Sequence, residues 1–127
     1  MKKTTALAIA VLIALAAAPC GRNEAQAAPA PTDAAHLIIV FHVSEDRLGD
    51  FLPIMTGVNE DMAGEEGFMN AVVYRDADDP LTFTLIEQWE SRALHEAHYE
   101  RIVEAGGWAN ILAMLTQAPV LRYNDKL

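Results

Sequence analysis

Hydrophobic and polar positions between residues 37 and 124 follow two different periods, and the changes from one to the other predict separate strands and helices. Residues 37–43 form a short run of β-branched and aromatic side chains, which favours a strand. Its odd-numbered positions are all apolar, and its even-numbered positions include Ile38 and Val40. Because both faces are largely apolar, we expect helices to cover one face and a partner chain to cover the other.

A helical period replaces the alternation after this strand. Apolar residues recur at three- and four-residue spacing over 48–62, and Ser44 or Asp46 can cap the start of such a helix. Pro53 and Gly57 lie inside the pattern, which predicts a kink or a late start. The glycine-containing stretch that follows is expected to end the helix.

The remaining pattern predicts a hairpin, two helical segments and a last strand. Turn residues rich in Asp and Pro separate two alternating runs, which is typical of an antiparallel hairpin. The expected bounds are 68–75 and 81–90 for the paired strands, 76–80 for their loop, a helix from Ser91 to a break at Gly106-Gly107, a helical piece over 108–116, and a strand over 120–124. The order β-α-β-β-α-β predicts an α+β fold of the ferredoxin-like kind. Helices on one side leave the other face of the sheet bare, so we expect a homodimer that pairs two sheets.

The N-terminal segment carries the features of a secretory signal. Lys2 and Lys3 precede an apolar run over residues 6–18, which is too short to span a bilayer as a stable helix. Small residues at 25 and 27 predict cleavage before Ala28. This assigns 1–27 to a signal peptide, 28–35 to a flexible leader and 36–127 to the folded domain, in a periplasmic or secreted protein.

A lipid anchor at Cys20 is the alternative exit for this segment. Cys20 follows the apolar run directly, but Pro19 before it fits a lipoprotein cleavage site poorly. We therefore expect the soluble product, without a membrane span in either case.

Composition removes several classes of function. Cleavage before Ala28 leaves 100 of the 127 residues, with 6 basic and 17 acidic side chains and no cysteine. A net charge of −11 repels phosphate backbones, so we expect no nucleic-acid partner. Disulfides and thiolate chemistry are also excluded from the mature domain. The chain also has no dinucleotide or P-loop fingerprint.

The junction between the predicted strand 81–90 and the next helix gathers the candidate site. His98 lies four residues from both Leu94 and Ile102, in the middle of the apolar stripe, so it points inward. It is either a core histidine bonded to a backbone carbonyl or to Glu87, or a pocket acid–base group.

Glu87 and Trp89 share the inward face of the same strand. A buried carboxylate there has a raised pKa unless it is paired. Glu87 either orients His98 or forms a structural ion pair, for example with Arg92 or Arg122. Trp89 serves either as core or as a pocket wall with one N–H to satisfy.

Other polar and aromatic candidates surround this pair. His95 and Tyr99 lie at the margin of the inward stripe, and Trp108 is expected on a segment that covers the pocket mouth, either as a mobile lid or as plain core. His95 and His98 are only two ligands, so we expect no metal site. His36 and His42 are expected at a dimer contact or a strand end.

Residues 37–124 resemble the antibiotic biosynthesis monooxygenase domain, a dimeric α+β barrel. The pieces that carry the resemblance are Glu66-Gly67-Phe68, Tyr74-Arg75-Asp76 with Asp79-Pro80, Glu87-Gln88-Trp89-Glu90-Ser91, and Ala97-His98. The resemblance implies cofactor-independent oxygenases of phenols and quinols, heme-degrading enzymes or isomerases. Heme degradation is disfavoured, because the first strand has no Asn and His98 stands where those enzymes place a Trp.

Together these observations predict an exported homodimer with an apolar pocket for a small aromatic or quinol ligand. The expected lining is Glu87, Trp89, His98, Tyr99 and Trp108. In the leading hypothesis His98 is a base or hydrogen-bond anchor, Glu87 assists it, and Trp89 is the stacking wall of a cofactor-independent monooxygenase. The alternative is a non-catalytic periplasmic module that carries a hydrophobic ligand.

Overall fold

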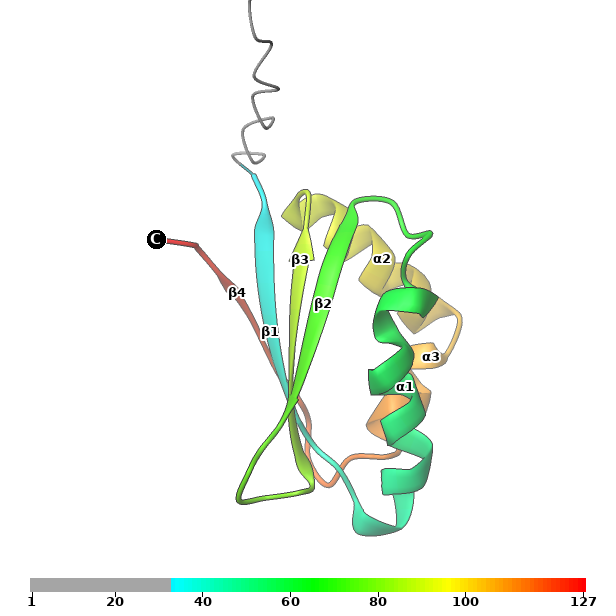
Figure 1. Ribbon diagram of the computed structural model, residues 1–127. Coiled ribbons are helices and arrows are strands. Elements are labelled where there is room, and N and C mark those ends of the chain that lie inside the picture. The colour runs from blue at the N-terminus through cyan, green and yellow to red at the C-terminus, as the bar shows by residue number, and fades with distance from the viewer. Residues whose placement is uncertain (1–32) are drawn as a thin grey trace, which may run out of the picture.

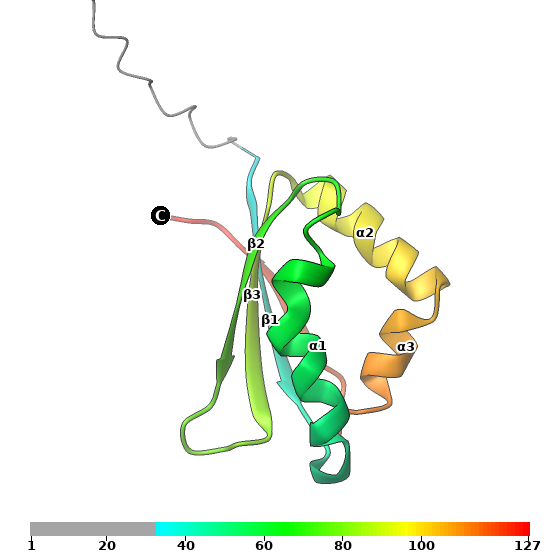
Figure 2. The same ribbon diagram turned by 45° about the vertical axis from the view of Figure 1, so that its right-hand side comes forward.

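Four antiparallel strands form one sheet, and the helices all lie against one of its faces (Figures 1 and 2). This computed structural model describes residues 33–127. The predicted signal peptide, its cleavage site and Cys20 lie outside the described residues. Within 33–127, no helix is both long and apolar enough to cross a bilayer.

The elements follow the predicted order along the chain. Their bounds are β1 Ala35–His42, the 3-10 turn η1 Glu45–Arg47, α1 Leu48–Asp61, β2 Phe68–Arg75, β3 Thr82–Trp89, α2 Arg92–Glu104, α3 Gly107–Leu112 and β4 Val120–Asn124. The strands lie in the order β2-β3-β1-β4. The ferredoxin-like α+β prediction is therefore confirmed, and the first strand starts at Ala35, one residue inside the predicted leader.

Alternation along β1 and β3 divides the sheet into a core face and a bare face. Ile39 pairs with Leu85 on β3 and with Leu121 on β4, so the odd-numbered positions of the three strands share one face. On β1 these positions are buried, and they pack with Phe51 and Met55 of α1. The hydrophobic burial that stabilises the fold is thus concentrated between this face and the helices.

The start of α1 differs from the predicted cap. Ser44 precedes η1, but its hydroxyl bonds the Asp46 carboxylate and makes no capping bond to the helix. The helix begins at Leu48, the first residue of the predicted helical pattern, and continues through Pro53 to end at Asp61. The late start that Pro53 and Gly57 offered as one alternative therefore does not occur.

The start of α2 is fixed by a cap and by a close approach. The Ser91 hydroxyl accepts the backbone N–H of Leu94 at 3.2 Å, which satisfies one free donor of the first turn. Gly67, at φ +80°, lies directly against Leu94, and its carbonyl accepts the N–H of Glu90 at 2.8 Å.

Gly106, also at φ +80°, separates α2 from α3, as the glycine pair predicted. α3 is shorter than expected and ends at Leu112.

Candidate functional site

A cavity of about 170 Å³ lies between the core face of the sheet and the helices. Most of its lining is apolar, and the polar members are Asp61, Glu87 and His98. The lining residues are Ile39, Phe41, Ile54, Met55, Val58, Asp61, Met62, Leu85, Glu87, His98, Ile102, Trp108 and Ile111. Larger hollows lie elsewhere on residues 33–127, but the side chains that border them are not buried titratable groups.

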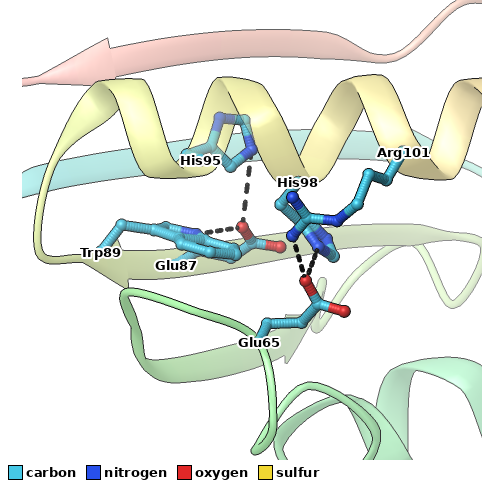
Figure 3. A network of polar contacts seen from close by, with 6 residues as sticks. All are labelled: Glu65, Glu87, Trp89, His95, His98 and Arg101. Atoms are coloured by element: carbon cyan, nitrogen blue, oxygen red, sulfur yellow. Dashed lines mark hydrogen bonds and ion pairs between the residues drawn. The ribbon is translucent and has the colours of Figure 1, made fainter.

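Glu87 is a buried carboxyl group on the floor of this cavity, with 5% of its surface exposed. The indole Nε1–H of Trp89 donates to Glu87 Oε2 at 2.8 Å, and His95 Nε2 lies 3.8 Å from the same oxygen (Figure 3). Burial raises the pKa of Glu87, and the Trp89 bond and the nearby His98 oppose that rise. The predicted inward position is confirmed.

The predicted ion pair of Glu87 with Arg92 or Arg122 is wrong. Arg92 donates to Glu96 at 2.7 Å and lies over the Tyr123 ring. Arg122 belongs to an even-numbered position of β4, on the bare face of the sheet. Alternation along β4 keeps Arg122 away from the core face, whereas Arg92 lies in the first turn of α2 and is held by Glu96 and the Tyr123 ring.

His98 points inward as predicted, but its partner is a residue that the sequence did not indicate. Its Nδ1 lies 2.9 Å from Glu65 Oε2, and Arg101 donates to the same oxygen at 2.6 Å (Figure 3). The expected bond of His98 to Glu87 or to a backbone carbonyl is therefore wrong. The Arg101 bond, with that of His98, lowers the pKa of Glu65. A carboxylate only accepts, so Nδ1 of His98 carries the donated hydrogen.

The second ring nitrogen of His98, a residue that lines the cavity, has no hydrogen-bond partner within residues 33–127. No hydrogen bond forms at Nε2, and no side-chain nitrogen or oxygen that is sealed from solvent within 33–127 lacks a partner. Nε2 is therefore accessible, although only 7% of the residue is exposed. With Nδ1–H held by Glu65, Nε2 of a neutral ring is a lone-pair acceptor.

Trp89 and Tyr99 do not line the cavity, in contrast to the prediction. Trp89 is 0% exposed and packs between the rings of His95 and His98, at centroid distances of 5.3 and 4.9 Å. Tyr99 is half-buried and contacts Trp108 edge-on at 5.4 Å. Of the five expected lining residues, the structure brings Glu87, His98 and Trp108 to the cavity. Trp89 supports them from behind.

His95 is more buried than its position at the margin of the stripe suggested. It is 5% exposed, and its Nδ1 lies 2.5 Å from the hydroxyl of Tyr123 on β4. Burial, with a smaller effect of His98, lowers the pKa of His95 to about 4. The ring is therefore neutral at neutral pH. No group of three potential metal ligands occurs within residues 33–127.

Comparisons with known proteins agree with this architecture. Residues 34–101 match the family model described as antibiotic biosynthesis monooxygenase. A candidate antibiotic biosynthesis monooxygenase from Nitrosomonas europaea is 23% identical, with a TM-score of 0.63, over 74% of this chain and 90% of that one. Rv0793 from Mycobacterium tuberculosis is 18% identical, with a TM-score of 0.65, over 75% of this chain and 96% of that one.

A conserved protein from Methanosarcina mazei Go1 is 17% identical, with a TM-score of 0.65, over 74% of this chain and 93% of that one. At these identities the structural likeness shows the fold alone. No curated protein matches the sequence.

Proposed function

Because the chain belongs to the antibiotic biosynthesis monooxygenase family, we propose that it oxidises a single-ring phenol or quinol with dioxygen and without a cofactor. The observation that carries this proposal is the open Nε2 of His98 at an apolar cavity, with Nδ1 held by Glu65. A base oriented by a carboxylate in this way is suited to removing a proton from a bound hydroxyl group.

The size of the cavity limits the substrate. A cavity of about 170 Å³ is close to the ~150 Å³ of an engineered apolar cavity that holds benzene. One aromatic ring with small substituents therefore fits, and a fused polycyclic substrate does not fit without opening α3. The apolar lining favours a flat ring and excludes water from it.

The reaction balances without an external reductant. Hydroquinone and dioxygen give hydroxyquinone and water, so one oxygen atom enters the ring and the other leaves as water. The ring supplies all four electrons that reduce dioxygen. A quinolate gives up electrons more readily than a neutral quinol, so the protein accelerates the reaction by removing the first proton.

Two side chains divide the acid–base work in this proposal. Nε2 of His98 takes the hydroxyl proton, and the Glu65 carboxylate stabilises the imidazolium that forms. Glu87 borders the same cavity and its pKa is raised, so it is suited to donate a proton to the oxygen atom that leaves as water. Removal of a positioned acid–base group typically lowers the rate by about 10²–10⁴-fold.

Oxygen consumption with substituted hydroquinones tests the assignment. After subtraction of the spontaneous reaction, we expect His98→Ala to oxidise the quinol about 10²–10⁴-fold more slowly than the wild type. We expect Glu65→Gln to be roughly tenfold slower, because the imidazolium loses its counter-charge. Glu66→Gln is the matched control, since Glu66 is exposed and next in sequence. Equal oxygen uptake by the wild type and His98→Ala removes His98 from the mechanism.

A non-catalytic carrier of a hydrophobic ligand is the second candidate, and the apolar lining of the cavity favours it as well. A carrier shows saturable quenching of the tryptophans by a phenol but no oxygen uptake. The N-terminal sequence supports export as part of this proposal. A protein processed before Ala28 acts outside the cytoplasm. Mass spectrometry of the mature N-terminus distinguishes this product from a lipid-modified one at Cys20.

A further inference from the structure

Two side chains behind Glu87 have no part in the reaction described above. The Tyr123 hydroxyl lies 2.5 Å from His95 Nδ1, and Nε2 of the same ring lies 3.8 Å from Glu87 Oε2. Tyr123 also borders an outer hollow of about 190 Å³, whereas Glu87 borders the cavity. The three groups thus form a line from the outside of the domain to the cavity.

The position of each hydrogen in this line follows from the partners. His95 has a single ring N–H at neutral pH, and burial also raises the pKa of Tyr123, which keeps its hydroxyl hydrogen. If Tyr123 donates to Nδ1, the ring hydrogen lies on Nε2 and faces Glu87 Oε2. The other tautomer turns a nitrogen lone pair toward a carboxyl oxygen that already accepts from Trp89, which is unfavourable.

Glu87 Oε2 therefore faces two N–H groups. Trp89 Nε1–H donates to it at 2.8 Å, and His95 Nε2 lies 3.8 Å from it, beyond hydrogen-bond distance but near enough for electrostatic attraction. An oxygen approached by two donors is a poor site for a proton of its own. The other oxygen, Oε1, lies on the side of His98 in Figure 3 and has no protein partner within residues 33–127.

We propose that Tyr123 and His95 are positioning residues, which direct any proton that Glu87 binds to Oε1, the oxygen on the side of His98 and the cavity. Tyr123 fixes the tautomer of His95, and His95 together with Trp89 reserves Oε2 as an acceptor. The catalytic use of this proton rests on the proposed function. The tautomer and the side on which Glu87 is protonated do not.

Other titratable and charged groups around this line come from three elements and bear on its pH dependence. Helix α2 contributes most of them, and β1 contributes none to the core face. The neighbouring groups are His98, Arg92 and Glu96 of α2, Glu65 beyond His98, and Asp61 of α1 across the cavity.

Nitrogen-15 NMR of the histidine rings tests the proposal without any substrate. In the wild type we expect the Nε2–H tautomer for His95. In Tyr123→Phe the O–H donor is lost and the ring packing is kept, so His95 populates the Nδ1–H tautomer as well. Its Nε2 lone pair then favours the protonated form of Glu87, and carbon-13 NMR of the Glu87 carboxyl shows the titration midpoint moving to higher pH. Tyr74→Phe is the control, since Tyr74 is 58% exposed.

Two results overturn the proposal. One is an Nδ1–H tautomer for His95 in the wild type, which needs no variant to fold. The other is a Glu87 titration that Tyr123→Phe leaves at the wild-type pH while circular dichroism shows an intact fold. If no quinol is oxidised, the NMR outcome still decides the tautomer. If quinols are oxidised, Tyr123→Phe moves the basic limb of the rate–pH profile in the same direction as the Glu87 titration, and Tyr74→Phe does not.

Discussion

Acid should destabilise the domain through His95, and His95→Gln should remove this part of the acid sensitivity. Burial holds the pKa of His95 at about 4, against 6.5 for an ordinary histidine. As the pH falls, the unfolded chain therefore binds a proton at His95 before the folded chain does. The stability that the neutral ring contributes is complete above pH 6.5, is lost between 6.5 and about 4, and changes no further below that.

The size of the effect follows from the same two values. A difference of one pKa unit corresponds to about 1.4 kcal/mol, so the fall from 6.5 to about 4 corresponds to a loss of about 3 kcal/mol at His95. At neutral pH, His95→Gln loses the hydrogen bond to Tyr123, at a cost of about 1 kcal/mol. The variant should therefore be less stable than the wild type at neutral pH and more stable, by about 2 kcal/mol, near pH 4.

Urea unfolding of both proteins at a series of pH values measures this crossing. Glu87 has a raised pKa, so its own contribution has the opposite sign: the penalty of burying its charge disappears as the pH falls. That contribution has the same sign in both proteins, so it does not by itself produce a crossing of the two curves. A difference that stays constant from neutral pH to pH 4 would refute the conclusion that His95 is buried in its neutral form.

Two further predictions concern the fold and its bare face. Gly67→Ala should lower the free energy of unfolding by about 1–3 kcal/mol more than Gly106→Ala does, measured by thermal or urea unfolding. Both glycines have φ +80°, but only a Cβ added at Gly67 meets Leu94, whose own Cβ would be 2.8 Å away. Equal losses would show that Leu94 moves aside at no cost. Val72, 44% exposed, and Tyr74 pair with even-numbered positions of β3 and so lie on the sheet face opposite the helices. We therefore expect light scattering to give a homodimer and Val72→Lys to give a monomer. A monomeric wild type would contradict the predicted sheet pairing.

The strands were predictable because alternation is a local signal. The bounds of β2 and β4 agree with the prediction at both ends, and β1 and β3 agree within about two residues. The inward direction of Glu87 and His98 followed from the same periods, of two residues in a strand and 3.6 in a helix. Each of these features depends only on neighbours in the sequence.

The partners within the site were not predictable from those periods. Glu65 lies 33 positions before His98, in a turn without any period, so only the folded chain brings the two together. Tyr123 lies 28 positions after His95, on strand β4, and its side chain covers the His95 ring. Trp89 shares the face of Glu87, but two residues along a strand separate the side chains by roughly 7 Å, which places the indole under the start of α2 and behind the cavity.

In the proposed function, the His98 cavity binds a single-ring quinol and lets it react with dioxygen. The most direct measurement is an anaerobic titration of the wild type with a hydroquinone, followed by admission of oxygen-18 dioxygen and mass analysis of the product. We expect saturable binding without oxygen and then a hydroxyquinone with one oxygen-18 atom, formed faster than in His98→Ala. Saturable binding followed by only the spontaneous reaction would contradict it, and would identify the protein as a carrier.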